Sequence, residues 1–212
     1  MERKEISKAV LKRLPGYLAY LKTLSDSTSP YISATTLANA LGMGEVQVRK
    51  DLAMVSDGGR PKIGYQRLAL IDDIEQFLGY DNTTDAVLIG AGKLGQALCG
   101  YTGFEAYGLN ILAAFDANPT AAATDEGKPI YPMEQLESFS KANKVLMGII
   151  TVPADKAQAV CDQLIDCGIK AVWNFAPTHL DVPANILVQN ENMATSLAVL
   201  SMHLQAQIKE KK

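Results

Sequence analysis

Apolar residues recur at helical spacing through most of the first eighty positions of the chain. Between residues 10 and 24 they return every three or four positions, which predicts an amphipathic helix that kinks or restarts at Pro15-Gly16. After a turn-rich segment at 25–30, Ser33 is placed to cap a second helix that Gly42 ends. A third helix, over 45–55, is expected to have two faces. The inward face holds Val46, Val48, Leu52 and Val55, and the outward face holds Gln47, Arg49, Lys50 and Asp51.

The second and third helices, joined by a glycine turn at 42–44, are typical of a helix-turn-helix that reads DNA. A helix fits the major groove, where Arg pairs with guanine and Gln with adenine. An ordinary helical hairpin with a solvated charged face would show the same pattern. The segment that follows, SDGGRPKIGYQRL, favours DNA binding, because it is basic and glycine-rich like the wing of a winged helix. A further amphipathic helix is expected over 68–79.

Two cations, Arg60 and Lys62, lie at the tip of this predicted wing. Arginine is a recurrent contact in narrow A·T-rich minor grooves, because the negative potential of the groove is enhanced there. A plain β-turn is the alternative for this segment. The residues predicted to contact DNA are Ser33, Gln47, Arg49, Lys50, Arg60 and Lys62.

The distribution of charge agrees with a DNA-binding N-terminal part. The formal net charge of the 212 residues is −3, yet residues 1–70 carry 11 Lys and Arg against 6 Asp and Glu. The remaining residues carry 9 against 17. A local basic region is what phosphate contacts need, so the acidic total does not exclude a nucleic acid partner.

Strand-like and helix-like segments alternate beyond the polar break at 81–84. The expected strands lie at 86–90, 109–116, 144–152, 169–175 and 185–189. The expected helices lie at 93–101, 133–138 and 154–168. Such alternation predicts an α/β domain with a Rossmann-like parallel sheet and helices on both of its faces.

A GxGxxG pattern, Gly90, Gly92 and Gly95, directly follows the first of these strands and opens the first helix. Gly90 permits a tight turn, Gly92 lets the backbone approach a pyrophosphate, and Gly95 allows the helix to pack closely on the strand. Asp116 follows 21 residues after Gly95, where an acid accepts hydrogen bonds from the ribose hydroxyls. Because this carboxylate would repel a 2′-phosphate, we expect NAD(H) rather than NADP(H). A glycine turn in an α/β domain that binds no nucleotide is the alternative.

Two further loops, at 151–153 and 174–177, lie at the carboxyl ends of predicted strands, where ligands bind in such sheets. Both are expected to cover the nicotinamide end, although Phe175 would serve equally well in the core. The residues predicted to bind the cofactor are Gly90, Ala91, Gly92, Lys93, Leu94, Gly95, Asp116, Thr151, Val152, Pro153, Asn174, Phe175, Ala176 and Pro177.

Catalytic chemistry finds little support in the sequence. The chain has two histidines: His203 lies in an apolar helical stripe, and His179 lies in a Pro-rich loop without an obvious carboxylate partner. No segment remains for a substrate domain, so the nucleotide is interpreted as a signal, and the protein as a regulator rather than an enzyme. Three cysteines without a CxxC pair, no secretory signal and no apolar run of membrane length predict a cytoplasmic protein with reduced thiols and no metal site. A thiol sensor is the alternative use of the cysteines.

Several motifs, spread over nearly the whole chain, resemble those of Rex, a family of bacterial redox-sensing transcriptional repressors. They are QVRKDL at 47–52, GY at 64–65, GAGKLGQAL at 90–98, FD at 115–116, TVP at 151–153, GIKAVWNFAP at 168–177 and VP at 182–183. The resemblance implies a homodimer whose winged helices bind palindromic operators and are released when NADH displaces NAD⁺. It also implies that the last helix is swapped onto the partner subunit, which suits the apolar stripe from Met193 to Ile208.

The chain departs from the family pattern at three places. AMVSDGGRPK replaces an aromatic, glycine-rich run after RKDL, Ala19 replaces a basic residue, and Asn192 replaces an Asp. The last two changes remove both members of an ion pair that the family is expected to use in coupling nucleotide to domain angle.

Together these observations predict three parts: a winged-helix domain at 1–80, an NAD(H)-binding domain at 81–190 and a dimerisation helix at 191–212. Two other classes stay open. One is a small NAD-dependent oxidoreductase with an accessory helical domain, and the other is a CoA- or nucleotide-binding regulatory module. A CoA site would not need Asp116.

Overall fold

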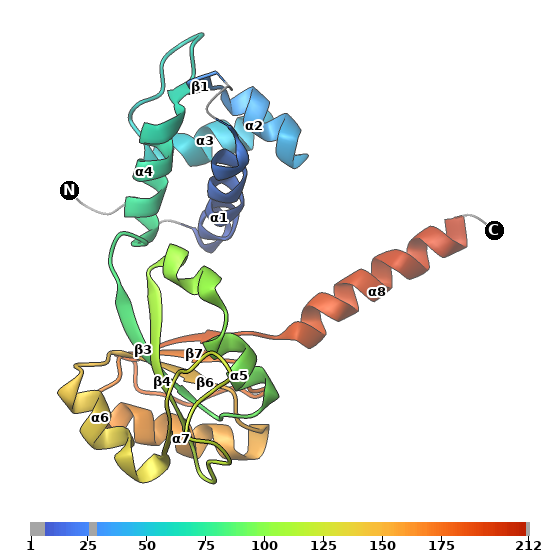
Figure 1. The fold of residues 1–212 in the computed structure, drawn as a ribbon. Coiled ribbons are helices and arrows are strands. Elements are labelled where there is room, and N and C mark those ends of the chain that lie inside the picture. Colours follow the sequence, from blue (N-terminus) through green and yellow to red (C-terminus); the bar gives the residue numbers. More distant parts are fainter. Residues whose placement is uncertain (1–6, 26–28, 211–212) are drawn as a thin grey trace. The chain divides into compact units, whose positions relative to one another are not determined.

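Figure 1 shows the fold of the chain in a computed structural model, which describes residues 7–25 and 29–210. The chain divides into two compact units, Met1–Asn82 and Thr83–Lys212, and the division falls within the polar segment at 81–84. Residues 26–28 of the expected turn lie outside the described part. Within that part, no helix combines the length and the apolar character needed to cross a bilayer.

Four helices of the first unit, α1 (Lys8–Thr23), α2 (Ala34–Leu41), α3 (Glu45–Val55) and α4 (Arg67–Leu78), pack around one apolar core. The helix α1 continues through Pro15, so the predicted restart there is wrong. Leu14 and Tyr17, on either side of the proline, are both fully buried in the same core, which holds the two halves of α1 in one helix.

The predicted ends of α2 are confirmed. The Ser33 hydroxyl accepts a hydrogen bond from the Thr36 N–H at 3.0 Å, which satisfies one of the free donors at the start of the helix. Gly42 ends the helix in the left-handed conformation, with φ of 63°.

Two positions on α3 face opposite to the prediction. Val46 is 66% exposed, whereas Asp51 is fully buried. At about 100° per residue, the inward-facing residues Val48, Leu52 and Val55 share their side of the helix with Asp51, and Val46 lies on the far side. Polarity alone therefore predicts the wrong side for Val46 and Asp51, whereas their angular positions around the helix predict the correct one.

A two-stranded antiparallel sheet, β1 (Tyr31–Ile32) with β2 (Tyr65–Gln66), forms the base of the wing. The wing closes at a turn in which the Arg60 and Gly64 backbones exchange two hydrogen bonds of 2.9 Å. Gly64 has φ of 93°, and a Cβ there would lie 2.3 Å from the Ile32 carbonyl oxygen. The turn therefore needs glycine at that position. The strand β1 was not predicted.

The second unit is built on a six-stranded sheet in which every neighbouring pair is parallel, in the order β5-β4-β3-β6-β7-β8. This is the doubly wound order expected for a Rossmann-like domain, and it places a topological switch between β3 and β6. The strands are β3 (Thr84–Ile89), β4 (Leu109–Asp116), β5 (Ile130–Pro132), β6 (Met147–Ile150), β7 (Ala171–Asn174) and β8 (Leu187–Asn190).

Helices cover both faces of this sheet, as predicted (Figure 1). Alternate residues of β3 divide between two apolar clusters: Val87 packs with α6 (Leu136–Ala142) and α7 (Ala154–Asp166), and Leu88 packs with α5 (Lys93–Cys99) and the short helix η1 (Thr102–Tyr107). The sequence analysis missed β5 and η1, and the helix that it expected over 133–138 is divided between the short helix η2 (Met133–Gln135) and the start of α6. A final helix, α8 (Met193–Glu210), follows β8.

Candidate dinucleotide site and nucleic-acid interface

The glycine turn between β3 and α5 is packed too tightly for side chains at two of its positions. Gly90 is buried with φ of 104°, a region that L-residues rarely adopt. A Cβ on Gly95 would lie 1.9 Å from the Gly90 carbonyl oxygen, so α5 approaches β3 only because residue 95 has none. Around Gly92 nothing lies within 4 Å of the Cβ position, which leaves open space beside the backbone at the start of α5.

The end of β6 holds this turn from the other side of the topological switch. The Thr151 hydroxyl lies 2.8 Å from the Gly90 carbonyl oxygen and 3.0 Å from that of Ile89, and it donates to them. A Cβ on Gly90 would also be 3.0 Å from a methyl carbon of Val152. The structure thus brings the predicted segments 90–95 and 151–153 together, with Pro153 exposed at the rim.

Asp116 lies at the end of β4 beside the same turn. One carboxylate oxygen accepts a hydrogen bond from the Ala91 N–H at 2.8 Å, and the other accepts one from the Asn118 N–H at 2.9 Å. Each oxygen keeps a further lone pair for another donor. The side chain is half-buried, so the hydroxyl group of a ligand can still reach it from the solvent side.

Asn174, at the end of β7, is fully buried and makes several hydrogen bonds within the chain. Its amide nitrogen donates to the Thr178 carbonyl and to the Asn190 amide oxygen, and its oxygen accepts from the Ala176 N–H. These bonds shape the loop 175–178. Asn174 therefore supports the conformation of that loop.

Phe175 is half-buried in an aromatic row on the α5 face of the sheet. Its ring centroid lies 4.8 Å from that of Trp173, which in turn lies 5.5 Å from Phe104. The Phe175 N–H donates to the Ile150 carbonyl at 2.9 Å, which ties this loop to the end of β6. Of its neighbours in the predicted site, Ala176 is buried and Pro177 is exposed.

The cysteines lie in environments that disfavour thiolates. Cys99 and Cys161 are buried, and burial raises the pKa of Cys99 to about 11. Burial also raises the pKa of Cys167, with a smaller contribution from Glu137. Because the thiolate is the reactive form, the structure gives no support to a thiol sensor. His179 is exposed, with no side-chain partner among the described residues.

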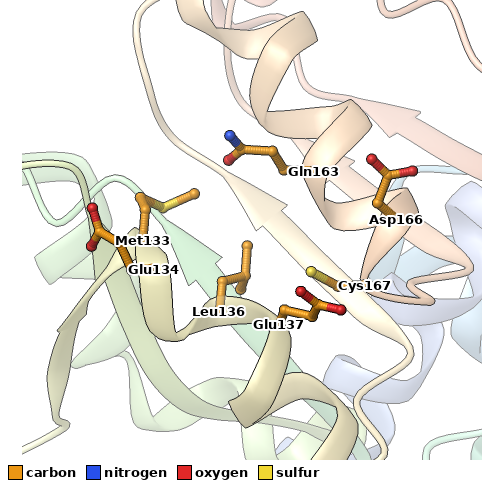
Figure 2. Close-up of a pocket in the computed structure, with 7 residues that line it drawn as sticks. All are labelled: Met133, Glu134, Leu136, Glu137, Gln163, Asp166 and Cys167. Carbon is orange, nitrogen blue, oxygen red and sulfur yellow. The ribbon is translucent and has the colours of Figure 1, made fainter.

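A separate pocket lies between α6 and the end of α7 (Figure 2). Its lining includes three carboxylates, Glu134, Glu137 and Asp166, together with the Cys167 thiol. Glu137 forms an ion pair with Lys141 at 2.5 Å. Within residues 7–25 and 29–210, no group of three or more His, Cys, Asp or Glu side chains is placed to hold a metal ion. The pocket contains none of the predicted site residues.

In the first unit, four of the six residues predicted to contact DNA line one surface hollow between the start of α2, the outer side of α3 and the wing. They are Ser33, Arg49, Arg60 and Lys62. Tyr65 also lines this hollow. A Cβ on Gly59 would lie 2.8 Å from the Cζ atom of the Tyr65 ring, so the ring packs closely against the Gly59 backbone. Gln47 and Lys50 are exposed on α3 outside the hollow. Arg49 forms an ion pair with Glu45 one helical turn earlier.

Asp51 anchors α3 to α1, and sequence reasoning missed this role. Its carboxylate accepts hydrogen bonds from Arg13 at 2.7 and 2.9 Å, from the Tyr17 hydroxyl at 2.7 Å and from the Gln47 amide at 2.8 Å. Burial raises the pKa of Asp51, but the bonds from Arg13, Tyr17 and Gln47 outweigh it and hold the pKa below its ordinary value. One signal in the sequence could have revealed it. Asp51 falls at an inward-facing position of α3, and Arg13 lies next to the inward-facing Leu14 of α1, so the two opposite charges could pair between the helices.

The helix α8 exposes its whole length from Met193 to Lys209. Five of its large apolar residues recur every three or four positions and so lie along one side of the helix, whereas Val199 and Met202, which are also exposed, lie off this side. The five are Met193, Leu197, Leu200, Leu204 and Ile208, each between 46% and 66% exposed. Asn192 stands just before the helix and accepts a hydrogen bond from the Thr195 N–H at 3.1 Å.

Comparison with known proteins matches both units. A family described as CoA binding domain matches residues 81–178, and a family described as putative DNA-binding protein N-terminus matches residues 5–53. The redox-sensing transcriptional repressor Rex of Bacteroides thetaiotaomicron is 39% identical over 197 residues, 92% of this chain and 90% of that protein. The Rex of Clostridium botulinum is 40% identical over 207 residues, 97% of this chain and 99% of that protein.

The crystal structures of RSP, a Rex-family repressor, match the fold over the same extent. RSP in complex with β-NAD⁺ and operator DNA aligns with a TM-score of 0.88 at 35% identity, over 98% of this chain and 96% of RSP. RSP in complex with β-NADH aligns with a TM-score of 0.83 at 35% identity, over 99% of this chain and all of RSP.

A winged-helix unit joined to a Rossmann-like unit defines a DNA-binding regulator that responds to a nucleotide. At about 40% identity over more than nine tenths of its length, the chain belongs to the Rex family of redox-sensing transcriptional repressors.

Proposed function

We propose that this chain represses transcription by binding palindromic operator DNA, and that NADH releases it. The observation that carries the proposal is the hydrogen bond from the Ala91 N–H of the glycine turn to the Asp116 carboxylate. In the other unit of the same chain, one hollow is lined by Ser33, Arg49, Arg60 and Lys62. RSP, with the same fold, is known in complex with β-NAD⁺ and operator DNA and in complex with β-NADH.

In the dinucleotide site, we assign the pyrophosphate to the open space at Gly92 and to the backbone N–H groups of Lys93 and Leu94. Those donors have no partner within the first turn of a helix, and they favour an anion. Asp116 accepts hydrogen bonds from the adenosine ribose while it keeps its bond to Ala91.

The nicotinamide end is assigned to the loops after β6 and β7. Thr151, Val152 and Pro153 border the glycine turn, and Phe175, Ala176 and Pro177 are tied to the end of β6. Asn174 holds the second loop in shape. The two redox forms differ in charge and planarity at the nicotinamide ring, so these loops are where NADH and NAD⁺ are distinguished.

In the DNA interface, α3 enters the major groove and the wing reaches the minor groove. Gln47, Arg49 and Lys50 lie on the exposed side of α3, and Arg60 and Lys62 lie at the wing tip. Ser33 lies at the start of α2 with its backbone close to the wing, because the Gly64 Cβ position is 3.1 Å from the Ser33 Cα.

We assign the assembly to a homodimer joined through α8. Five exposed large apolar side chains on one side of a helix are unfavourable in water at about 25 cal/mol per Å² of apolar surface. A two-fold pairing would cover them and place two wings on the half-sites of a palindrome. The protein acts in the cytoplasm, where its operators and NAD(H) are, and it carries no enzymatic activity.

The test is a mobility shift with the full chain and DNA selected from a random library. The expected result is a palindromic consensus that is retained with NAD⁺ and lost with NADH. CoA serves as the control ligand, because a CoA-binding family matches residues 81–178. Failure to select any sequence would overturn the repressor assignment. Turnover of NADH with simple aldehydes or ketones would establish the oxidoreductase instead.

A further inference from the structure

The buried carboxylate of Asp51 has a contact that reaches the exposed side of α3. Three of its hydrogen bonds come from inside the unit, from Arg13 and Tyr17. The fourth comes from the amide nitrogen of Gln47, one helical turn earlier, at 2.8 Å. Gln47 itself is exposed, whereas Asp51 is fully buried.

This contact fixes which end of the Gln47 amide faces inward. An ionised carboxylate has lone pairs and no hydrogen to donate, so it attracts the amide nitrogen and repels the amide oxygen. The bidentate pair with Arg13 keeps the carboxylate ionised and fixes its position, and Tyr17 adds one hydrogen bond to the oxygen that Gln47 does not contact. The amide oxygen of Gln47 is therefore the end left to face a partner outside the protein.

We infer that Asp51 is a positioning residue for base recognition, which presets Gln47 to accept a hydrogen bond from an exocyclic amino group in the major groove. Adenine and cytosine present such an amino group there, whereas guanine and thymine present a carbonyl oxygen at the corresponding place. Gln47 then distinguishes the two orientations of one base pair. This inference rests on the proposed DNA-binding function and adds to it the chemical class of base that is read.

The test is a double-mutant cycle with the full chain on operators changed at one base pair at a time. Q47L identifies the base pair that Gln47 reads, because discrimination falls there by about five- to one-hundred-fold. D51N is expected to lose most of the same preference, to keep the preferences at other base pairs, and to add no further loss in the Q47L background. Y17F, which removes a hydrogen bond to Asp51 but leaves Gln47 bonded, is the matched control and should keep the preference.

The inference is overturned if D51N weakens every operator by the same factor, if Q47L changes no position, or if Y17F loses the preference as fully as D51N. Because D51N removes a buried charge and is able to unfold the unit, NMR of the unaltered free protein provides a second measurement. One Nε2 proton of Gln47, assigned by its absence in Q47L, should be shifted away from the position of a solvated amide. Two solvated-amide protons would contradict the inference. If the unaltered protein binds no operator, the proposed function fails, whereas this spectrum still decides the orientation of Gln47.

Discussion

The carboxylate of Asp116 accepts a hydrogen bond from the backbone N–H of Ala91 at 2.8 Å, across the gap between the end of β4 and the glycine turn. One side chain thus fixes the turn and presents an anion beside it. The same anion is suited to ribose hydroxyls and unsuited to a 2′-phosphate.

Replacing Asp116 by Ala should therefore weaken NADH binding and narrow the difference between NADH and NADPH. Losing charge-assisted hydrogen bonds of this kind costs about 1.5–3 kcal/mol, which is roughly ten- to one-hundred-fold in affinity. Calorimetry with both nucleotides measures the effect, and D125A, on an exposed acid in the loop before β5, is the control. Equal affinity for the two nucleotides in the unaltered protein would refute the assignment.

Two glycines of the turn should respond differently to the same substitution. At Gly92 a methyl group meets nothing within 4 Å, so G92A should fold normally and lose nucleotide affinity by obstructing the pyrophosphate. At Gly95 a methyl group would lie 1.9 Å from the Gly90 carbonyl oxygen, so G95A should lower the melting temperature as well. Thermal unfolding beside calorimetry separates the two effects. Undiminished NADH binding in G92A would mean that the pyrophosphate lies elsewhere.

The wing and α3 should contribute different kinds of DNA contact. K50A and R49A should weaken operator binding and leave NADH binding unchanged. If the lost contact is to a base, discrimination at that one base pair should fall by about 1–3 kcal/mol, whereas a lost phosphate contact should weaken binding to all sequences alike. R60A should mainly relax the preference for A·T pairs at the operator flanks. Footprinting and anisotropy measure both effects, and K156A, on an exposed lysine of α7, is the control. If all three variants keep the footprint and affinity of the unaltered chain, the wrong surface has been assigned.

The cluster around Asp51 should make the stability of the first unit depend on pH. The pKa of Asp51 is lowered in the folded state, so its contribution is fully present above about pH 4, the ordinary aspartate value, and is lost as pH falls through the lowered pKa. Urea unfolding from pH 7 to pH 3 should show that R13Q is destabilised at pH 7, by about 3 kcal/mol, and that this difference shrinks at low pH. A difference that stays constant over the whole range would show that Asp51 is not ionised in the folded protein.

Much of this arrangement was readable from the sequence, because the signals were local. The parallel strands appear as apolar runs, and the glycine spacing with Asp116 marks the end of two of them. Asp51 was missed because its partner Arg13 lies 38 residues away, on another helix, and only packing brings them together. Asn174 was placed correctly at a strand end, but its contacts with Asn190 and Thr178 depend on how the loop folds. The strand β5 has three residues and no pattern that distinguishes it from a loop.

The exposed apolar side of α8 leads to a prediction about assembly. Truncation after Asn192 removes Met193 through Ile208 and should abolish both dimerisation and operator binding, since one half-site contact is too weak alone. L200E in the otherwise intact chain tests the same point without shortening it, and Q205E, on the same helix away from the stripe, is its control. Sedimentation and mobility shift measure the two effects. A truncated protein that sediments as a dimer and binds DNA in an NADH-sensitive way would show that α8 is not the interface.

The central claim is that one chain binds NAD(H) and operator DNA and that the first controls the second. Fluorescence anisotropy of a labelled selected operator, at fixed salt and constant total nucleotide, measures this directly while the NADH to NAD⁺ ratio is varied. We expect bound DNA to fall as the ratio rises, and we expect D116A, but not D125A, to raise the total nucleotide concentration needed for this response, because the adenosine ribose is common to NADH and NAD⁺. A DNA affinity that is the same at every ratio, in a protein shown by calorimetry to bind NADH, would contradict it.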